Sequence, residues 1–202
     1  MSFRTENKFI LSKKKLFEFK QWLDQNNYSI LFEKRYVNSI YFDTKNFMIF
    51  KDSIEGTTPR KKIRIRTYSK LFFHKNNKFS LEIKISSVEG RYKKIKELND
   101  GVSTFLIGYN DNQYGTCFPV LNVSYEREYF IRDNSRVTID TNIKYSSVNK
   151  KVISNYCYQE SNCVVENKLT KNDNNEMLKF FPFSQARFSK YCNGIEKVYP
   201  EI

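Results

Sequence analysis

The chain has 202 residues, with 35 Lys and Arg against 22 Asp and Glu and a formal net charge of +13. Hydrophobic residues make up 40% and aromatic residues 16% of the chain, which excludes a disordered basic tail and predicts one domain over residues 1–202 with a sizeable core. The single histidine, His74, excludes sites built from two histidines, and the six glycines match neither GxGxxG nor GxxxxGK[ST]. A phosphate ligand would therefore be bound by side chains rather than by a glycine-rich loop.

Hydrophobic periodicity predicts strands interrupted by a few short helices. The first half is expected to hold a strand at Thr5–Leu11, a helix from the Ser12 cap to Gln25, an extended segment at Arg35–Asp43, a helix at Thr44–Asp52, and strands at Lys61–Tyr68, Phe79–Ile85 and Tyr92–Leu98. The second half is expected to hold a helix at Val102–Tyr109, strands at Val120–Arg132, Arg136–Tyr145 and Asn162–Leu169, and helices at Asn175–Phe181 and Phe188–Lys197. About eight strands predict an α+β, mainly β fold: one antiparallel β-barrel or strongly curved sheet with short helices outside.

Charged residues repeat at every second position of these strands, so they share one face of each strand. In the Lys61–Tyr68 strand, Lys62, Arg64 and Arg66 alternate with Ile63 and Ile65. The same spacing groups Glu6 with Lys8, Glu82 with Lys84, Tyr125 with Arg127, Arg136 with Asp140, and Glu166 with Lys168. An ordinary solvent-exposed face is one interpretation of a single strand. Six strands with the same cationic pattern favour a barrel lumen lined with Lys and Arg, which a bound polyanion would stabilise.

Four carboxylates share that face and supply oxygen ligands suited to Mg²⁺ or Mn²⁺: Glu6, Glu82, Asp140 and Glu166. For Asp140, an ion pair with Arg136 on the same strand is at least as good an interpretation as a metal ligand. The four cysteines form no CxxC pair, which favours reduced thiols, and Cys192 is expected to be a small buried hydrophobic residue.

No signal peptide or apolar run of membrane-spanning length is found, which predicts a cytoplasmic protein and leaves peripheral membrane association open. The net charge predicts an anionic partner, and nucleic acid, a membrane surface and polyphosphate all qualify. No helix-turn-helix, zinc-finger or RNP motif is present, so nucleic acid is not the expected partner.

The sequence resembles the VTC-type polyphosphate polymerase domain of the triphosphate tunnel metalloenzyme (CYTH-like) superfamily. The resemblance covers nearly the whole chain and lies in an ordered set of motifs: RTENKFIL, VNSIYFDT, RKKIRIRTY, LEIKIS with GRYKK, PVLNVSYERE, RVTIDTNI, VVENKL and FSKYCNGIE. It implies an eight-stranded antiparallel β-barrel, the triphosphate tunnel fold, with short helices packed outside and at the C-terminus.

The resemblance also implies roles for individual residues. The residues matched to catalytic phosphate contacts are Lys8, Arg64, Arg66, Lys84, Lys93, Arg127 and Lys190. Those matched to substrate binding are Tyr125, Arg136, Arg187, Ser189 and Lys94, the last as an alternative to Lys93. Glu166 matches the metal-binding carboxylate, and Arg187 stands where eukaryotic relatives carry a lysine. A planar guanidinium in place of an ammonium keeps the charge but alters the geometry of phosphate binding.

The implied activity is an ATP-dependent polyphosphate polymerase that uses Mn²⁺ or Mg²⁺ to add the γ-phosphate of ATP to a growing polyphosphate chain. Two alternatives stay open at this point: hydrolysis of tripolyphosphate or nucleoside triphosphates within the same superfamily, and polyphosphate binding without catalysis. The partners implied are ATP and inorganic polyphosphate or triphosphate. The sequence leaves the oligomeric state undetermined.

Overall fold

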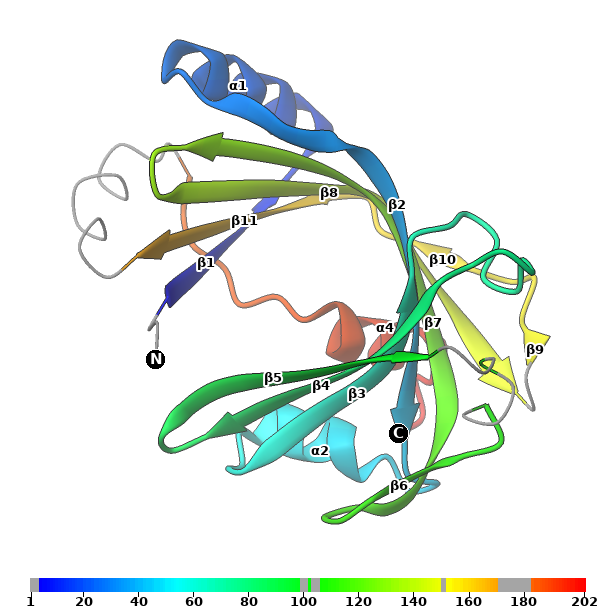
Figure 1. Cartoon of the computed structure of the whole chain (residues 1–202). Coiled ribbons are helices and arrows are strands. Elements are labelled where there is room, and N and C mark those ends of the chain that lie inside the picture. Colours follow the sequence, from blue (N-terminus) through cyan, green and yellow to red (C-terminus); the bar gives the residue numbers. More distant parts are fainter. Residues whose placement is uncertain (1–3, 99–101, 103–105, 150–151, 171–182) are drawn as a thin grey trace. The chain divides into compact units, whose positions relative to one another are not determined.

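A computed structural model describes residues 4–98, 102, 106–149, 152–170 and 183–202 (Figure 1). The chain divides into two compact units, which are described separately below. Unit 1 comprises Met1–Arg35, Tyr125–Ile143 and Glu160–Phe188, and unit 2 comprises Tyr36–Ser124, Lys144–Gln159 and Ser189–Ile202. The prediction of a single domain over residues 1–202 stays a prediction.

Unit 1 combines strands β1 (Arg4–Leu11) and β11 (Cys163–Thr170) with helix α1 (Lys13–Gln25) and with parts of three longer strands. Those are β2 (Ser29–Asp43), β7 (Gly115–Arg132) and β8 (Ser135–Asn149). Ser12 caps α1 as predicted, since its hydroxyl oxygen accepts a hydrogen bond from the Lys15 backbone N–H at 3.3 Å. The core joins Phe19 and Leu23 of α1 to Phe9, Val137 and Val165 of the strands.

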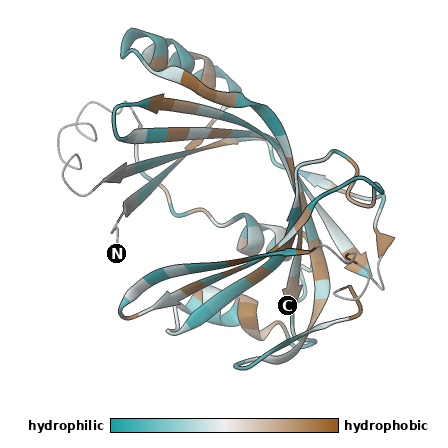
Figure 2. Ribbon diagram, in the orientation of Figure 1, coloured by the Kyte–Doolittle hydropathy of each residue, from teal (hydrophilic) through white to brown (hydrophobic). Residues whose placement is uncertain are grey.

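Unit 2 contains helix α2 (Met48–Glu55), strands β3 (Arg60–Thr67), β4 (Phe79–Ser87) and β5 (Gly90–Leu98), and helix α4 (Lys190–Val198). It also contains three short strands, β6 (Tyr109–Asp111), β9 (Val152–Ile153) and β10 (Tyr158–Gln159), and the remaining parts of β2, β7 and β8. Helix α2 packs against β3 and α4. Apolar and polar segments alternate along the strands (Figure 2), which confirms the alternation expected from the sequence.

The main path of the sheet has the order β1-β11-β8-β7-β2-β3-β4-β5, and β6, β9 and β10 pair at its margins. The path has eight strands, and the pairs β1–β11, β11–β8, β2–β3, β3–β4 and β4–β5 are antiparallel. In the described part of the chain, no pairing joins β5 to β1. The expectation of a closed barrel is therefore wrong for the described sheet. Strand β5 has the character of an edge strand, because Arg91, Lys93, Lys94 and Lys96 are exposed along it.

Two predicted helices need correction. The helix expected from Thr44 begins at Met48, because Asp43 accepts hydrogen bonds from the Ile49 and Phe50 backbone N–H groups and so caps the later start. In the segment expected to be helical from Val102 to Tyr109, Tyr109 opens strand β6, and residues 103–105 lie outside the described residues. The helix expected at Asn175–Phe181 lies outside them as well.

Helix α4 confirms the last predicted helix, with Ser189 as its N-cap. His74 is exposed and Cys192 is buried, as expected, and all four cysteines are free. No helix of the described residues is long and apolar enough to cross a membrane.

Candidate functional site

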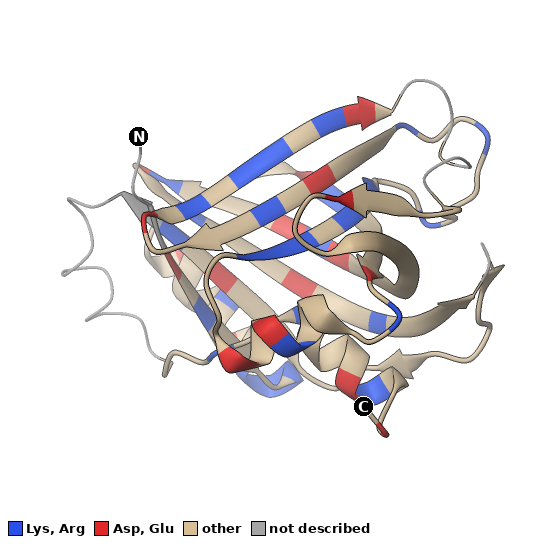
Figure 3. Ribbon diagram, turned by 90° about the horizontal axis from the view of Figure 1, so that it is seen from below, with Lys and Arg blue, Asp and Glu red and all other residues tan. Residues whose placement is uncertain are grey.

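Three strands of unit 2 place a row of lysines directly opposite one another. Lys62 of β3 pairs in register with Lys84 of β4, and Lys84 pairs with Lys93 of β5. Like charges at directly opposed positions of a sheet destabilise it. Figure 3 shows how Lys and Arg recur along the strands of the chain. A row of three ammonium groups is therefore an arrangement that an anion lying across the strands would stabilise.

The neighbouring positions of β3 carry two buried arginines beside one buried carboxylate. Arg64 and Arg66 are each 8% exposed and Glu82 is 4% exposed. Arg64 donates to Glu82 through Nε at 2.8 Å and Nη2 at 2.5 Å, and Lys93 Nζ donates to the same carboxylate at 2.8 Å. An ordinary solvent-exposed face would leave guanidinium groups exposed, so the burial of these two argues against that interpretation.

Glu82 is the main counterion of these cations. Burial alone would raise the pKa of its carboxyl, but the charges of Arg64 and Arg66 outweigh burial and lower the pKa from 4.5 to about 2. Glu82 is therefore ionised at neutral pH and committed to its cationic neighbours. Both of its oxygens are engaged by these cations, Oε2 by Arg64 and Oε1 by Arg66 and Lys93. The expectation that Glu82 supplies a metal ligand therefore receives no support.

The start of helix α4 brings Ser189 to the lysine row, and Lys190 is the first residue of that helix. Lys62 Nζ donates to the Ser189 hydroxyl oxygen at 2.7 Å, and the same oxygen accepts from the Cys192 backbone N–H at 3.3 Å as the helix cap. Lys62 was grouped with Arg64 and Arg66 by strand alternation but was not among the residues matched to the family. The register and the contact with Ser189 now place it in the candidate site.

The pairing of β4 with β5 places Lys93 and Lys94 on opposite faces of the sheet. Lys93 lies opposite Lys84 on the cationic face, whereas Lys94 lies opposite Ile83 and so belongs to the other face of the strand. Of the two lysines weighed from the sequence, Lys93 is therefore the one brought together with Arg64, Glu82 and Lys84.

Unit 1 holds a second charged group, which lies on β1, β11 and β8. Lys8 pairs in register with Glu166, and Glu166 pairs with Thr138. Glu166 is 8% exposed and forms an ion pair with Lys168 at 2.8 Å. Burial alone would raise the pKa of the Glu166 carboxyl, but Lys168, Arg127 and Lys8 together hold the pKa well below its usual range. Glu166 is thus an ionised, nearly buried carboxylate surrounded by cations.

Arg127 forms a bidentate ion pair with Asp140, a residue with no exposed surface. The Nε atom lies 2.5 Å from Oδ1 and Nη2 lies 2.7 Å from Oδ2, and the guanidinium carbon lies 5.2 Å from the centroid of the buried Tyr125 ring. Burial opposes the charge on Arg127, but Asp140 raises the pKa of the guanidinium above its ordinary value. The sequence interpretation that paired Asp140 with Arg136 is therefore wrong, because Asp140 binds the arginine of the adjacent strand β7.

The segment before α4 runs beside β1. The Ala186 backbone N–H donates to the Lys8 carbonyl at 2.8 Å, and Lys8 Nζ donates to the Phe188 carbonyl at 3.0 Å. These bonds bring Arg187, which is exposed, into the neighbourhood of Lys8. Arg136 is also exposed and lies opposite Lys168 in the register of β8 and β11.

The cationic partners of the remaining carboxylates on the charged face indicate which of them could bind a metal ion. Asp140 is bound to Arg127, and Glu6 lies 3.2 Å from Lys8. Among the described residues, no group of three or more His, Cys, Asp or Glu side chains could hold a metal ion. The donor set does not fit a metal bound by protein alone. One ionised carboxylate, Glu166, fits an Mg²⁺ or Mn²⁺ ion whose remaining ligands are phosphate oxygens and water.

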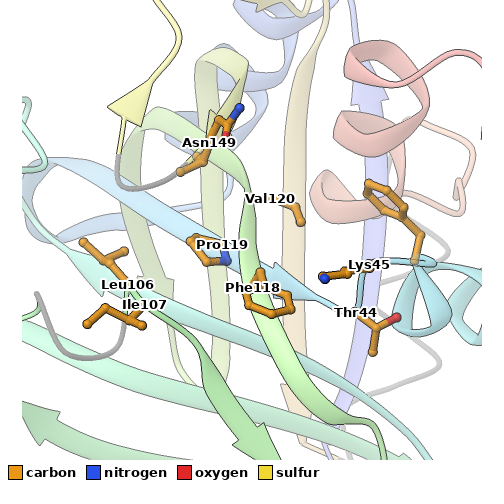
Figure 4. A pocket seen from close by; sticks show the side chains of 10 residues that line it. Thr44, Lys45, Leu106, Ile107, Phe118, Pro119, Val120 and Asn149 are labelled. Atoms are coloured by element: carbon orange, nitrogen blue, oxygen red, sulfur yellow. The ribbon is translucent and has the colours of Figure 1, made fainter.

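A pocket of about 530 Å³ lies elsewhere in unit 2 (Figure 4). Its lining is mostly apolar, and Lys45 is the one charged side chain among the lining residues, which are Thr44, Lys45, Phe47, Leu106, Ile107, Phe118, Pro119, Val120, Val148 and Asn149. A chain of phosphates needs several cations, so this pocket does not carry the chemistry of the two charged groups.

Comparison with known proteins agrees with these observations. The model of the VTC domain family matches residues 3–113 and 107–199. A protein from Vibrio parahaemolyticus, named as a candidate adenylate cyclase, has a similar structure with a TM-score of 0.54 at 12% identity, over 93% of this chain and 95% of that one. A conserved hypothetical protein from Pyrococcus furiosus has a TM-score of 0.58 at 15% identity, over 94% of this chain and 99% of that one. No curated protein matches the chain.

Proposed function

The chain belongs to the VTC domain family, and from this premise we propose that it is a polyphosphate polymerase that transfers the γ-phosphate of ATP to a growing polyphosphate chain. The observation that carries the proposal is the lysine row Lys62–Lys84–Lys93, which lies beside buried Arg64 and Arg66. Only an extended anion of high charge density would engage all five cations, and a polyphosphate chain has that chemistry.

The reaction needs little covalent help from the protein. A terminal oxygen of the acceptor polyphosphate attacks the γ-phosphorus of ATP, the bond from that phosphorus to the β,γ-bridging oxygen breaks, and ADP leaves with the electron pair. The attacking oxygen is already anionic, so no proton has to be removed from it. Catalysis then rests on positioning and on stabilising the charge of the transferred phosphoryl group.

In the proposal, each unit contributes its own cations to these tasks. In unit 2 the residues proposed to bind phosphate oxygens are Lys62, Arg64, Arg66, Lys84, Lys93, Ser189 and Lys190. In unit 1 they are Lys8, Tyr125, Arg127, Arg136 and Arg187. Because Arg127 is already bound to Asp140 by two of its nitrogens, its contribution is a fixed charge rather than a flexible arm.

Glu166 is proposed to hold the divalent metal, either Mn²⁺ or Mg²⁺. Lys168, Arg127 and Lys8 keep the pKa of its carboxyl well below the usual range, so an anionic oxygen is present at neutral pH. The metal would neutralise charge on phosphate oxygens when bound. Lys8 lies opposite Glu166 in the register and would keep a phosphate oxygen near that carboxylate.

The test is to incubate the protein with ATP labelled at the γ-phosphate and Mn²⁺ or Mg²⁺, and to separate the products on a polyacrylamide gel. The proposal predicts a ladder of labelled polyphosphate, together with ADP. Release of single phosphate without chain growth would instead support a hydrolase. Tight binding of polyphosphate without turnover, unchanged by Glu166→Ala, would support a binding module.

A matched pair of variants ties the activity to the cationic face. Lys84 lies in the middle of the lysine row, whereas Lys96 lies opposite Leu81 on the other face of the sheet, and both are exposed. We expect Lys84→Met to lower kcat/KM for ATP by about tenfold or more, since one charge-assisted contact with phosphate is lost. Lys96→Met, with the same change of charge, should leave kcat/KM within about twofold. Equal losses in the two variants would contradict the proposal.

A further inference from the structure

Tyr41 of β2 lies within the VNSIYFDT motif and on the cationic face, although no role was assigned to it from the sequence. It pairs in register with Arg64, and its hydroxyl oxygen accepts a hydrogen bond from Arg64 Nη1 at 2.8 Å. Glu82 accepts from Nε and Nη2 of the same guanidinium. The planar Arg64 side chain is therefore held along two of its edges by two different oxygens, and these fix the direction in which the guanidinium faces.

The Tyr41 ring is itself fixed by helix α4. It stacks on the ring of Tyr191 with the centroids 5.2 Å apart and an interplanar angle of 26°. Tyr191 donates its hydroxyl hydrogen to Asp43, a carboxylate with no exposed surface that also caps helix α2. Tyr41 thus connects Arg64 to the helix whose first turn carries Ser189 and its contact with Lys62.

The groups that face Tyr41 are mainly cationic. They are Arg64 and Arg66 of β3 and Lys84 of β4, with Tyr191 of α4 on the stacking side and Asp43 beyond it. Burial alone would raise the pKa of the Tyr41 phenol, but the three cations outweigh burial and lower the pKa to about 8. Above that pH a phenolate adds one negative charge to the cationic face.

We propose that Tyr41 is a positioning residue that orients Arg64 for a phosphate oxygen and links this orientation to helix α4. The proposal rests on the proposed function, because it takes a phosphate chain as the ligand of Arg64. Tyr41 is 6% exposed, and it acts through Arg64 rather than by touching the reacting atoms.

The protonation state of Tyr41 makes phosphate binding depend on pH. A neutral phenol accepts one bond from Arg64 and adds no negative charge beside a guanidinium that Glu82 already partly neutralises. A phenolate competes with phosphate for the same guanidinium, so the affinity for an anionic ligand falls as the pH rises through about 8. If only the phenol form binds, the dissociation constant rises about tenfold between pH 7 and pH 9.

The experiment measures the binding of inorganic tripolyphosphate by isothermal titration calorimetry at pH 7 and pH 9, with ionic strength held constant. The full chain, Tyr41→Phe and the control Tyr114→Phe are compared. Tyr114 is a suitable control because its hydroxyl bonds to Asp52, away from the cationic face. We expect the unsubstituted protein and Tyr114→Phe to lose about tenfold in affinity between the two pH values. At pH 7, Tyr41→Phe should bind tripolyphosphate about 3- to 10-fold more weakly than the unsubstituted protein. The affinity of Tyr41→Phe should change little between pH 7 and pH 9.

Two results would overturn the positioning role. One is a Tyr41→Phe variant with the affinity and pH dependence of the unsubstituted protein. The other is an ultraviolet titration in which the unsubstituted protein and Tyr41→Phe form tyrosinate identically near pH 8, a readout that needs no ligand. If the unsubstituted protein binds no tripolyphosphate at either pH, the proposed function fails, and the positioning role fails with it. If circular dichroism shows that Tyr41→Phe does not fold, Arg64→Lys is used in its place. That variant should also abolish the change of affinity between pH 7 and pH 9.

Discussion

Replacing Glu82 with glutamine removes the carboxylate on which three cations converge. Arg64, Arg66 and Lys93 all lie within 3.5 Å of its oxygens, and Glu82 is 4% exposed. A neutral amide of the same size keeps the packing, so the change in stability reports the electrostatic role of Glu82. Buried cations that lose their counterion are costly, because neither water nor another anion replaces it.

The magnitude follows from the pKa of Glu82. A pKa lowered from 4.5 to about 2 corresponds to about 3 kcal/mol of folding free energy, at about 1.4 kcal/mol per pH unit. Because the folded-state pKa is the lower one, this stability is fully present above pH 4.5 and is lost as the pH falls toward 2. About 2 kcal/mol of it should be gone at pH 3.

The assay is urea unfolding followed by circular dichroism, for the unsubstituted protein and Glu82→Gln at pH 7 and pH 3. We expect Glu82→Gln to be less stable by about 3 kcal/mol at pH 7 and by about 1 kcal/mol at pH 3. Glu128→Gln is the control, since Glu128 pairs with the more exposed Lys20 and should cost at most about 1 kcal/mol. A Glu82→Gln variant as stable as the unsubstituted protein at pH 7, or a difference that grows at pH 3, would refute the reasoning.

Two further substitutions test the packing of unit 2 and the ion pair of unit 1. In Gly194→Ala the new Cβ would lie 2.6 Å from Leu121 Cδ2. We therefore expect the free energy of unfolding to fall by about 1–3 kcal/mol, seen by calorimetry as a Tm lower by several degrees. An unchanged Tm would contradict this close approach. In Arg127→Lys the bidentate ion pair with buried Asp140 is replaced by a single ammonium contact. We therefore expect the free energy of unfolding, measured in urea, to fall by about 2–3 kcal/mol. A loss below about 0.5 kcal/mol would mean that the guanidinium geometry is unimportant there.

The parts of the fold that depend on local chemistry could be predicted from the sequence. Ser12 was predicted as an N-cap followed by helical periodicity, and helix α1 begins directly after it; the last helix was expected from Phe188 and begins at Lys190, after the Ser189 cap. Strand alternation correctly grouped Lys62, Arg64 and Arg66 on one face, because a strand has no other periodicity. The family resemblance supplied the positions of the remaining candidate residues.

The parts that depend on pairing between distant segments could not be predicted in the same way. Alternation sorts the residues of one strand into two faces, but it does not say whether the first and last strands of a sheet pair, so closure was expected where the described sheet is open. The partner of Asp140 depends on β7 lying next to β8 in the sheet, which makes Arg127 rather than Arg136 its counterion. Tyr41 was missed because it stands between Ile40 and Phe42 with no Lys or Arg of its own strand two positions away, and only its pairing with Arg64 of β3 places it on the cationic face.

The most direct test of the central claim is phosphorus NMR of the protein incubated with ATP and Mg²⁺. The proposed function predicts that the γ-phosphate resonance of ATP declines while resonances of ADP and of internal phosphates of a polyphosphate chain grow. Lys84→Met should slow both changes. Growth of inorganic phosphate alone, or an ATP spectrum that never changes with Mg²⁺ or with added polyphosphate primer, would contradict the claim that this cationic face builds phosphate chains.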